Sequence, residues 1–144
     1  MKIFTIGFTK KSAEEFFACL QNAQVRRVVD IRLNNTSQLA GFAKARDLKY
    51  FLHAIAGIDY VHMADLAPTQ DIIDNFKKKK EPWAKFESGF RDLMAHRRIT
   101  ETAAKTLREN DCLLCSEHTP EHCHRRLVAE YLHEQLGNIK VIHL

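Results

Sequence analysis

Short apolar runs alternate along the chain with segments that have helical spacing. Each run is rich in β-branched or other apolar residues and is too short for a helix, which is typical of buried strands. The predicted strands cover residues 2–8, 25–33, 58–63, 112–115 and 139–143. Strands that alternate with helices predict an α/β fold with a mostly parallel sheet of about five short strands and helices on both faces. We expect residues 1–144 to form a single three-layer domain.

The helices between these runs have recognisable start signals. Ser12 followed by Glu15 forms a capping box, which predicts a helix that begins just after Ser12. Thr100 is predicted to cap a short helix in the same way. Thr119 as N-cap, with Pro120 at the first helical position, predicts the start of the helix that precedes the last strand. The polar segment 34–38 has no periodicity and is a candidate substrate loop.

The composition is that of an ordinary globular protein, with 45% hydrophobic and 28% charged residues. No apolar run is long enough to span a bilayer, and no signal peptide opens the chain, so we expect a cytoplasmic protein without a membrane partner. The net charge of +4 would help with a nucleic acid or an anionic small molecule but does not require either. Four cysteines in such a chain are better explained as reduced thiols or metal ligands than as disulfides. Cys19 and Cys112 lie in apolar patterns and are expected in the core.

One stretch, residues 112–126, concentrates thiols, imidazoles, carboxylates and guanidiniums in a predicted strand-to-helix connection. Cys115 and Glu117 come at and just after the strand, and Cys123, His124 and Arg125 come in the first turns of the predicted helix. A thiol near a helix N-terminus and beside cations has its pKa lowered. The same amides, together with Arg125, would hold an anion. The stretch therefore predicts a reactive thiol, an anion site, or both.

Other chemically active residues fall at the ends of the other predicted strands. Gly7 ends the first, Asp30 and Arg32 end the second, and His62 ends the third. Ligands of open parallel sheets lie beyond the carboxyl ends of the strands, so we expect these residues to meet Cys115 at one edge. Asp30 and Arg32 are equally consistent with a structural ion pair, and His62 with a structural role at the rim.

The cysteines and histidines of the stretch permit three interpretations: a catalytic thiol, a metal site, or buried and inert groups. Zinc sites commonly use cysteines that are two to four residues apart, whereas seven residues separate Cys115 from Cys123. A site that joins the two cysteines to one of His118, His122 or His124 is still sterically conceivable. We therefore assign no metal and no cofactor from the sequence, and keep metal binding as an alternative.

The motif segments together resemble the family known as domain of unknown function 488. The resemblance rests on residues 4–9, 29–32, 60–62, 66–69, 113–117 and 123–126. Its most specific part is the pattern Cys-x-Glu, five further residues, and Cys-His-Arg. Two departures stand out: Phe8, where many relatives carry histidine, and Ala67-Pro68, where others carry two glycines. The resemblance implies a compact α/β domain and no particular reaction. It implies a shared site made by Asp30, Arg32, Cys115, Glu117, Cys123, His124 and Arg125.

These observations predict an enzyme that binds an anionic, phosphate- or nucleotide-like substrate at the carboxyl edge of the sheet. The predicted catalytic residues are Cys115, Glu117, Cys123 and His124. The predicted substrate-binding residues are Gly7, Asp30, Arg32, His62 and Arg125. The first alternative is a non-enzymatic module that binds nucleic acid or an acidic protein through Arg97, Arg98, Arg125 and Arg126. The second is a metal-binding protein that uses the Cys/His cluster.

Overall fold

The computed structural model describes residues 1–36 and 41–144. Five strands form one sheet in the order β3-β2-β4-β1-β5, and every neighbouring pair is parallel. The strands are β1 (Lys2–Gly7), β2 (Arg27–Asp30), β3 (Asp59–His62), β4 (Asp111–Cys115) and β5 (Lys140–His143). The predicted α/β fold is confirmed, with a sheet that is parallel throughout. In the predicted loop 34–38, residues Ser37 and Gln38 lie outside the described residues.

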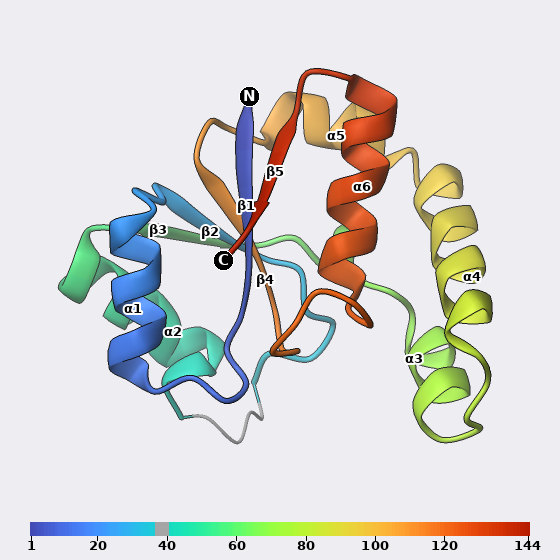
Figure 1. Cartoon of the computed structure of the whole chain (residues 1–144), viewed down its shortest axis with the longest axis horizontal. Helices are drawn as coiled ribbons and strands as arrows, with labels where there is room; N and C mark the ends of the chain where they lie inside the picture. Colours follow the sequence, from blue (N-terminus) through green and yellow to red (C-terminus); the bar gives the residue numbers. More distant parts are fainter. Residues whose placement is uncertain (37–40) are drawn as a thin grey trace.

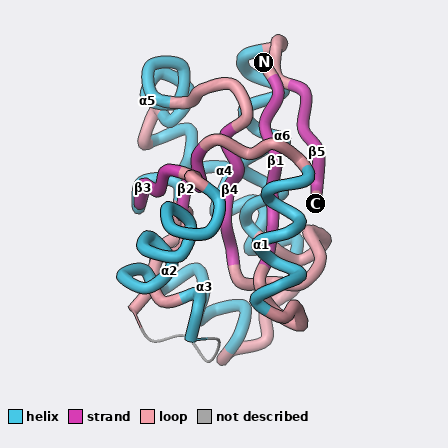
Figure 2. Tube along the Cα trace, turned by 90° about the vertical axis from the view of Figure 1, so that its left-hand side faces the viewer, coloured by secondary structure: helices cyan, strands magenta, loops and turns pink. Residues whose placement is uncertain are grey.

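Helices cover both faces of the sheet (Figure 1). The helices of the described chain are α1 (Ala13–Asn22), α2 (Ala45–Phe51), α3 (Gln70–Lys77), α4 (Trp83–His96), α5 (Ile99–Thr106) and α6 (His124–Leu136). Short helical turns are η1 (Gly41–Ala43), η2 (Leu52–Ala56), which is π-helical, and η3 (Ala64–Leu66). Helices α1 and α2 lie on one side of the sheet and α4, α5 and α6 on the other, and the view in Figure 2 shows the strands running between these layers.

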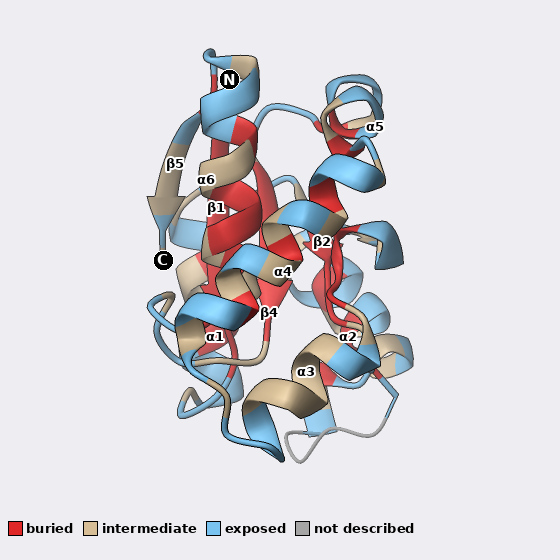
Figure 3. Ribbon diagram, turned by 90° about the vertical axis from the view of Figure 1, so that its right-hand side faces the viewer, coloured by how far each residue is buried: buried red, intermediate tan, exposed pale blue. Residues whose placement is uncertain are grey.

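The core is split in two because successive side chains of a strand point to opposite faces. Val28 of β2 and Leu114 of β4 pack with α1 and α2, whereas Val29 and Leu113 pack with α4, α5 and α6. Figure 3 shows β1, β2 and β4 buried and the outer surfaces of the helices exposed, whereas the edge strands β3 and β5 are partly exposed. Cys112 is fully buried in the first of these clusters, as expected. Helices thus cover both faces of the sheet, so the ends of the strands are where a functional site can open to solvent.

The register brings the ends of four strands to one edge. Gly7 of β1 lies opposite Cys115 of β4, and Asp30 of β2 lies opposite Leu114 of β4 on one side and His62 of β3 on the other. The residues that follow these strands therefore start from neighbouring points. This is the edge at which parallel sheets bind ligands.

Two predicted helix starts are wrong, and one is confirmed. Ser12 caps α1, since its Oγ accepts a hydrogen bond from the Glu15 amide. Helix α5 begins at Ile99 rather than after Thr100, with Arg98 in a left-handed conformation (φ 55°) as its N-cap. The start moves because burial of Ile99 draws that residue into the first turn.

Helix α6 begins at His124, with Cys123 as its N-cap, and not after Thr119. Residues 116–122 form bends and a turn, in which the Cys123 amide donates to the Pro120 carbonyl. Proline suits the start of a turn as well as the start of a helix. The Arg125 guanidinium reaches back from α6 and donates to the carbonyl oxygens of Glu117 and His118, just before this turn.

Candidate active site

A pocket of about 420 Å³ opens at the carboxyl edge of the sheet, between the ends of β2 and β4 and helices α3, α4 and α6. This volume falls in the range of about 300–1,000 Å³ that is usual for small-molecule sites. The predicted residues that line it are Arg32, Cys115, Glu117, Cys123 and His124. The structure thus brings together residues that are far apart in the sequence.

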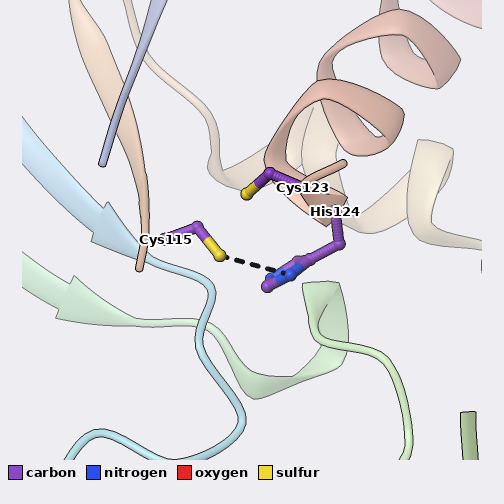
Figure 4. A group of neighbouring side chains, drawn as sticks. All are labelled: Cys115, Cys123 and His124. Atoms are coloured by element: carbon purple, nitrogen blue, oxygen red, sulfur yellow. Dashed lines mark hydrogen bonds between the residues drawn. The ribbon is translucent and has the colours of Figure 1, made fainter. Parts of the chain in front are cut away.

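Cys115 and His124 form the most direct contact in the pocket (Figure 4). Cys115 ends β4 and His124 begins α6, and the Cys115 Sγ lies 3.3 Å from the His124 Nδ1. The His124 Nε2 lies 2.7 Å from the carbonyl oxygen of Ile31. Because a carbonyl oxygen only accepts, Nε2 must carry the hydrogen, and Nδ1 of the neutral ring is an acceptor that faces the sulfur. Burial lowers the pKa of His124, which keeps the ring neutral near pH 7.

The two pocket thiols have opposite acidities. Burial would raise the pKa of Cys115, but hydrogen bonds from the Cys123 thiol and from the Ser116 and Glu117 amides, together with the Arg125 charge, bring it below the ordinary thiol value. Burial and the proton shared with Cys115 raise the pKa of Cys123. The geometry therefore makes Cys115 the more acidic of the two thiols and Cys123 the hydrogen-bond donor beside it.

The same cluster has the donor set of a metal site. One ligand atom each from Cys115, Cys123 and His124 lies within 4.8 Å of the other two. Two thiolates and an imidazole are ligands that zinc prefers. Of the three histidines considered from the sequence, His124 lies with the thiols. His118 contacts the Thr9 carbonyl instead, and the ring of His122 lies on Trp83.

Asp30 and Arg32 form a buried ion pair behind the pocket. The Asp30 side chain is fully buried, and its carboxylate accepts hydrogen bonds from Arg32 Nε and Nη2, both at 2.8 Å. Tyr60 Oη and Asn35 Nδ2 also donate to it. Burial would raise the pKa of Asp30, but the hydrogen bonds and charge of Arg32 and the Tyr60 hydroxyl lower it overall. Asp30 is therefore charged and fixes the guanidinium of Arg32.

One guanidinium nitrogen of Arg32, Nη1, has no hydrogen-bond partner within the described ranges. Arg32 is only 2% exposed, so this nitrogen is buried. The guanidinium lies over the ring of Phe8, 5.4 Å from the centroid. Phe8, one of the two departures noted in the sequence, is thus a neighbour of Arg32.

Three predicted binding residues lie around the pocket rather than in its lining. Arg125 is fully buried and donates to backbone carbonyls of the 116–122 segment and, at 3.8 Å, to the Cys123 sulfur. A Cβ on Gly7 would lie 1.5 Å from the Glu117 carbonyl oxygen, so glycine is needed for this approach. His62 is exposed, and its Nε2 lies 2.8 Å from the Arg32 carbonyl oxygen. These residues are placed to support the site.

Glu117 stands at the rim. Its side chain is 46% exposed and lies 3.8 Å from the Lys77 Nζ, so it contacts neither thiol directly. Of the basic residues in the binding-module alternative, Arg97 donates to the carbonyls of Asp65 and Ala67, and Arg98 and Arg126 pair with glutamates on their own helices. That alternative stays a prediction.

An aromatic wall was missed by sequence reasoning. It consists of Phe76, Trp83, Phe86 and His122, all of which line the pocket. Trp83 stacks on Phe86 with centroids 4.5 Å apart and planes at 13°, and His122 lies 5.0 Å from it. Helical spacing indicates that an aromatic side chain faces inward. It does not tell whether that side chain also lines a pocket: Phe86, for example, is buried in the core and lines the pocket as well.

Within the described ranges, no helix combines the length and the apolar character needed to cross a membrane. No curated protein and no solved structure matches the chain. Residues 12–132 match the family profile described as "Domain of unknown function DUF488". This range contains the Cys-x-Glu and Cys-His-Arg segments and the Asp30–Arg32 pair, and leaves out β1 and β5. Because the match covers most of its 144 residues, the chain belongs to the DUF488 family.

Proposed function

We propose that the protein is an enzyme whose nucleophile is the Cys115 thiolate and whose substrate is anionic, of the phosphate- or nucleotide-like kind. The observation that carries this proposal is the chain of contacts from Cys115 Sγ through the His124 ring to the Ile31 carbonyl. A nucleophile in contact with a base, and a base oriented by a third group, is the usual arrangement for covalent catalysis.

The chemistry assigned to the residues is a substitution in two steps. His124 Nδ1 takes the thiol proton, and the sulfur electron pair forms a bond to the electrophilic atom of the substrate. The bond to the leaving group breaks, and the leaving group departs with its electron pair and the proton from His124. Water, deprotonated by His124, then displaces the sulfur and releases the product. The Cys123 thiol donates a hydrogen bond that stabilises the Cys115 thiolate whenever it is free.

Several groups support the anionic nature of the substrate. Arg32 contributes Nη1, which has no protein partner in the described chain, and Lys77 stands at the rim. Helix α6 directs its positive end at the pocket, and its N-cap Cys123 makes no side-chain capping bond in the described chain. Glu117 is assigned to hold Lys77 rather than to move protons. The proposal places the protein in the cytoplasm, where its four free thiols stay reduced.

The test is alkylation of the intact protein with iodoacetamide across a pH series, with each cysteine quantified by mass spectrometry. We expect Cys115 to be labelled with a midpoint below 9.0, the ordinary thiol value. His124→Asn should slow the labelling of Cys115 at a given pH, because the sulfur loses the base that takes its proton. Cys19, half-buried on α1, is the internal comparison. A Cys115 that titrates like Cys19, in both the wild type and His124→Asn, would overturn the proposal.

A second candidate function, metal binding, is favoured by the three ligand atoms within 4.8 Å of one another. Three protein ligands with an open fourth position is the arrangement of catalytic zinc sites. Elemental analysis of purified protein decides between the two functions. One equivalent of zinc that is lost in Cys115→Ser and kept in Cys112→Ser would replace the nucleophile proposal. Cys112 is the matched control because it is buried in the core on the same strand.

A further inference from the structure

Two residues that line this pocket each carry a buried hydrogen-bond donor for which the described chain offers no partner. The donors are Arg32 Nη1, on the side of β2, and Trp83 Nε1, at the start of α4. Buried donors are nearly always satisfied, so an unsatisfied one calls for an explanation. Two that line one pocket are explained together by a ligand that brings acceptor atoms to both. Arg32 is the stronger indication, since it is almost fully buried and fixed by Asp30.

The side of the pocket near Trp83 is aromatic. The rings of Phe76 and His122 lie 5.2 and 5.0 Å from the Trp83 ring, and Phe86 stacks on it. Aromatic surfaces bind planar rings by stacking, and each stacked base contributes about 1–3 kcal/mol. A simple phosphate compound would leave this wall and the Trp83 donor unused.

We propose that the substrate is a nucleotide-like anion whose heteroaromatic ring lies against the Phe76–Trp83–His122 wall and whose phosphate lies at Arg32. This inference rests on the proposed active site and names the class of molecule that it accepts. Trp83 Nε1 donates to an acceptor on the ring, and Arg32 Nη1 donates to a phosphate oxygen. The Cys115 sulfur lines the pocket that holds both groups. The ring is therefore required for recognition, and phosphate alone is not enough.

Trp83 is the only tryptophan in the chain, so its fluorescence reports on this pocket. Cys115→Ser protein would be titrated with AMP, UMP, adenosine and ribose 5-phosphate. We expect saturable quenching by at least one of the two nucleotides. Ribose 5-phosphate should bind at least about fivefold more weakly, because it lacks the stacked ring. Adenosine should also bind more weakly, because it lacks the phosphate. Equal affinity for ribose 5-phosphate and the nucleotides, or no quenching by either nucleotide, would overturn the inference.

Two variants test the contacts while keeping the fluorescence signal. Phe76→Leu should weaken the nucleotide about fivefold or more and leave ribose 5-phosphate unchanged. Its matched control is Phe51→Leu, which removes a half-buried aromatic ring on α2 and should change neither affinity. Arg32→Lys should weaken the nucleotide and leave adenosine unchanged. Circular dichroism would verify that each variant is folded. An unchanged nucleotide affinity in folded Phe76→Leu would count against the aromatic wall.

A protection experiment separates this inference from the proposed function. In the wild type, the bound nucleotide should slow alkylation of Cys115 and leave that of Cys19 unchanged. If binding depends on the ring but Cys115 titrates like an ordinary thiol, the proposal that Cys115 is the nucleophile is wrong and the proposal that the ligand is nucleotide-like stands. If Cys115 is reactive but no nucleotide slows its alkylation, the proposal of a nucleotide-like ligand is wrong and the proposal that Cys115 is the nucleophile stands.

Discussion

The Cα of Gly7 lies so close to the carbonyl oxygen of Glu117 that a Cβ at position 7 would stand 1.5 Å from it. The same Cβ would lie 2.4 Å from Arg125 Nη1. Gly7 is also the register partner of Cys115. The end of β1 thus fixes the position of the segment that follows Cys115.

Gly7→Ala should therefore displace the Glu117 carbonyl and the Arg125 guanidinium. We expect a loss of about 3 kcal/mol or more in the free energy of unfolding, measured by urea denaturation, because backbone atoms must move. Cys115 alkylation should also slow. Gly89→Ala is the matched control, since no described atom lies within 4 Å of its added Cβ and it sits inside α4. That variant should be about 0.5–1 kcal/mol more stable than the wild type.

Asp30→Asn should leave the buried Arg32 charge without its counter-ion. We expect a loss of about 3–5 kcal/mol in stability, together with weaker nucleotide binding, because Arg32 loses its fixed orientation. The control is Asp111→Asn, which breaks the ion pair with Arg27 on the same sheet. It should destabilise the fold as well, but leave nucleotide affinity unchanged under conditions where both variants are folded. Loss of affinity in both would show that the effect is general and not specific to Arg32.

Arg125→Met should raise the pH midpoint of Cys115 alkylation. The Arg125 charge helps to lower the Cys115 pKa, and its guanidinium holds the carbonyls of Glu117 and His118. Each carbonyl left without a donor costs about 1–3 kcal/mol if it stays buried. Arg126→Met, one residue along and paired with Glu130 on the surface, should leave the midpoint where it is. A midpoint that is unchanged in Arg125→Met, or that rises as much in Arg126→Met, would mean that Arg125 does not position the thiolate.

Stability should fall as the pH drops below about 6.5. The pKa values of His124 and His143 are lowered in the fold, first by burial, so the unfolded chain takes up protons that the folded chain does not. His124→Asn should reduce the slope of unfolding free energy against pH just below 6.5, the ordinary histidine pKa, and His143 accounts for a further part. His53→Asn, an exposed position on η2, is the control.

The lowered pKa of Asp30 affects stability in a different pH range. The stabilisation from Asp30 is present above 3.8 and is lost as the pH falls through the lower pKa of the folded state.

The strands and their shared edge were predictable because they depend on local patterns. Apolar runs such as Val28-Val29 and Leu113-Leu114 identify buried strands, and parallel strands bring their ends together. The strand order was not predictable, because β1 enters between β4 and β5 and nothing local specifies its neighbours. Pairing across the sheet is decided by packing of distant segments.

The sequence predicted which residues come together in the candidate site better than it predicted the role of each one. Cys115 and His124 do meet, as the motif suggested, because one ends β4 and the other begins α6. Thr119 and Pro120 misled because proline also suits the start of a turn, which is what the segment before α6 forms. Arg125 was predicted to bind the substrate, and in the structure its Nη1 and Nη2 donate to the carbonyl oxygens of Glu117 and His118. These contacts join a side chain to backbone carbonyls, so the spacing of residue types does not predict them.

The position of β1 between β4 and β5 has a consequence for biosynthesis. Both of its neighbours, β4 and β5, lie beyond residue 110, so β1 leaves the ribosome well before either. The strand therefore has neither neighbour to pair with while about a hundred further residues are made. Its apolar side chains, including Ile3, Phe4 and Ile6, stay unburied during that time. Closure of so long an intervening segment is slow compared with local pairing. The nascent chain therefore forms the edge that Gly7 shares with Cys115 only after β4 has been made.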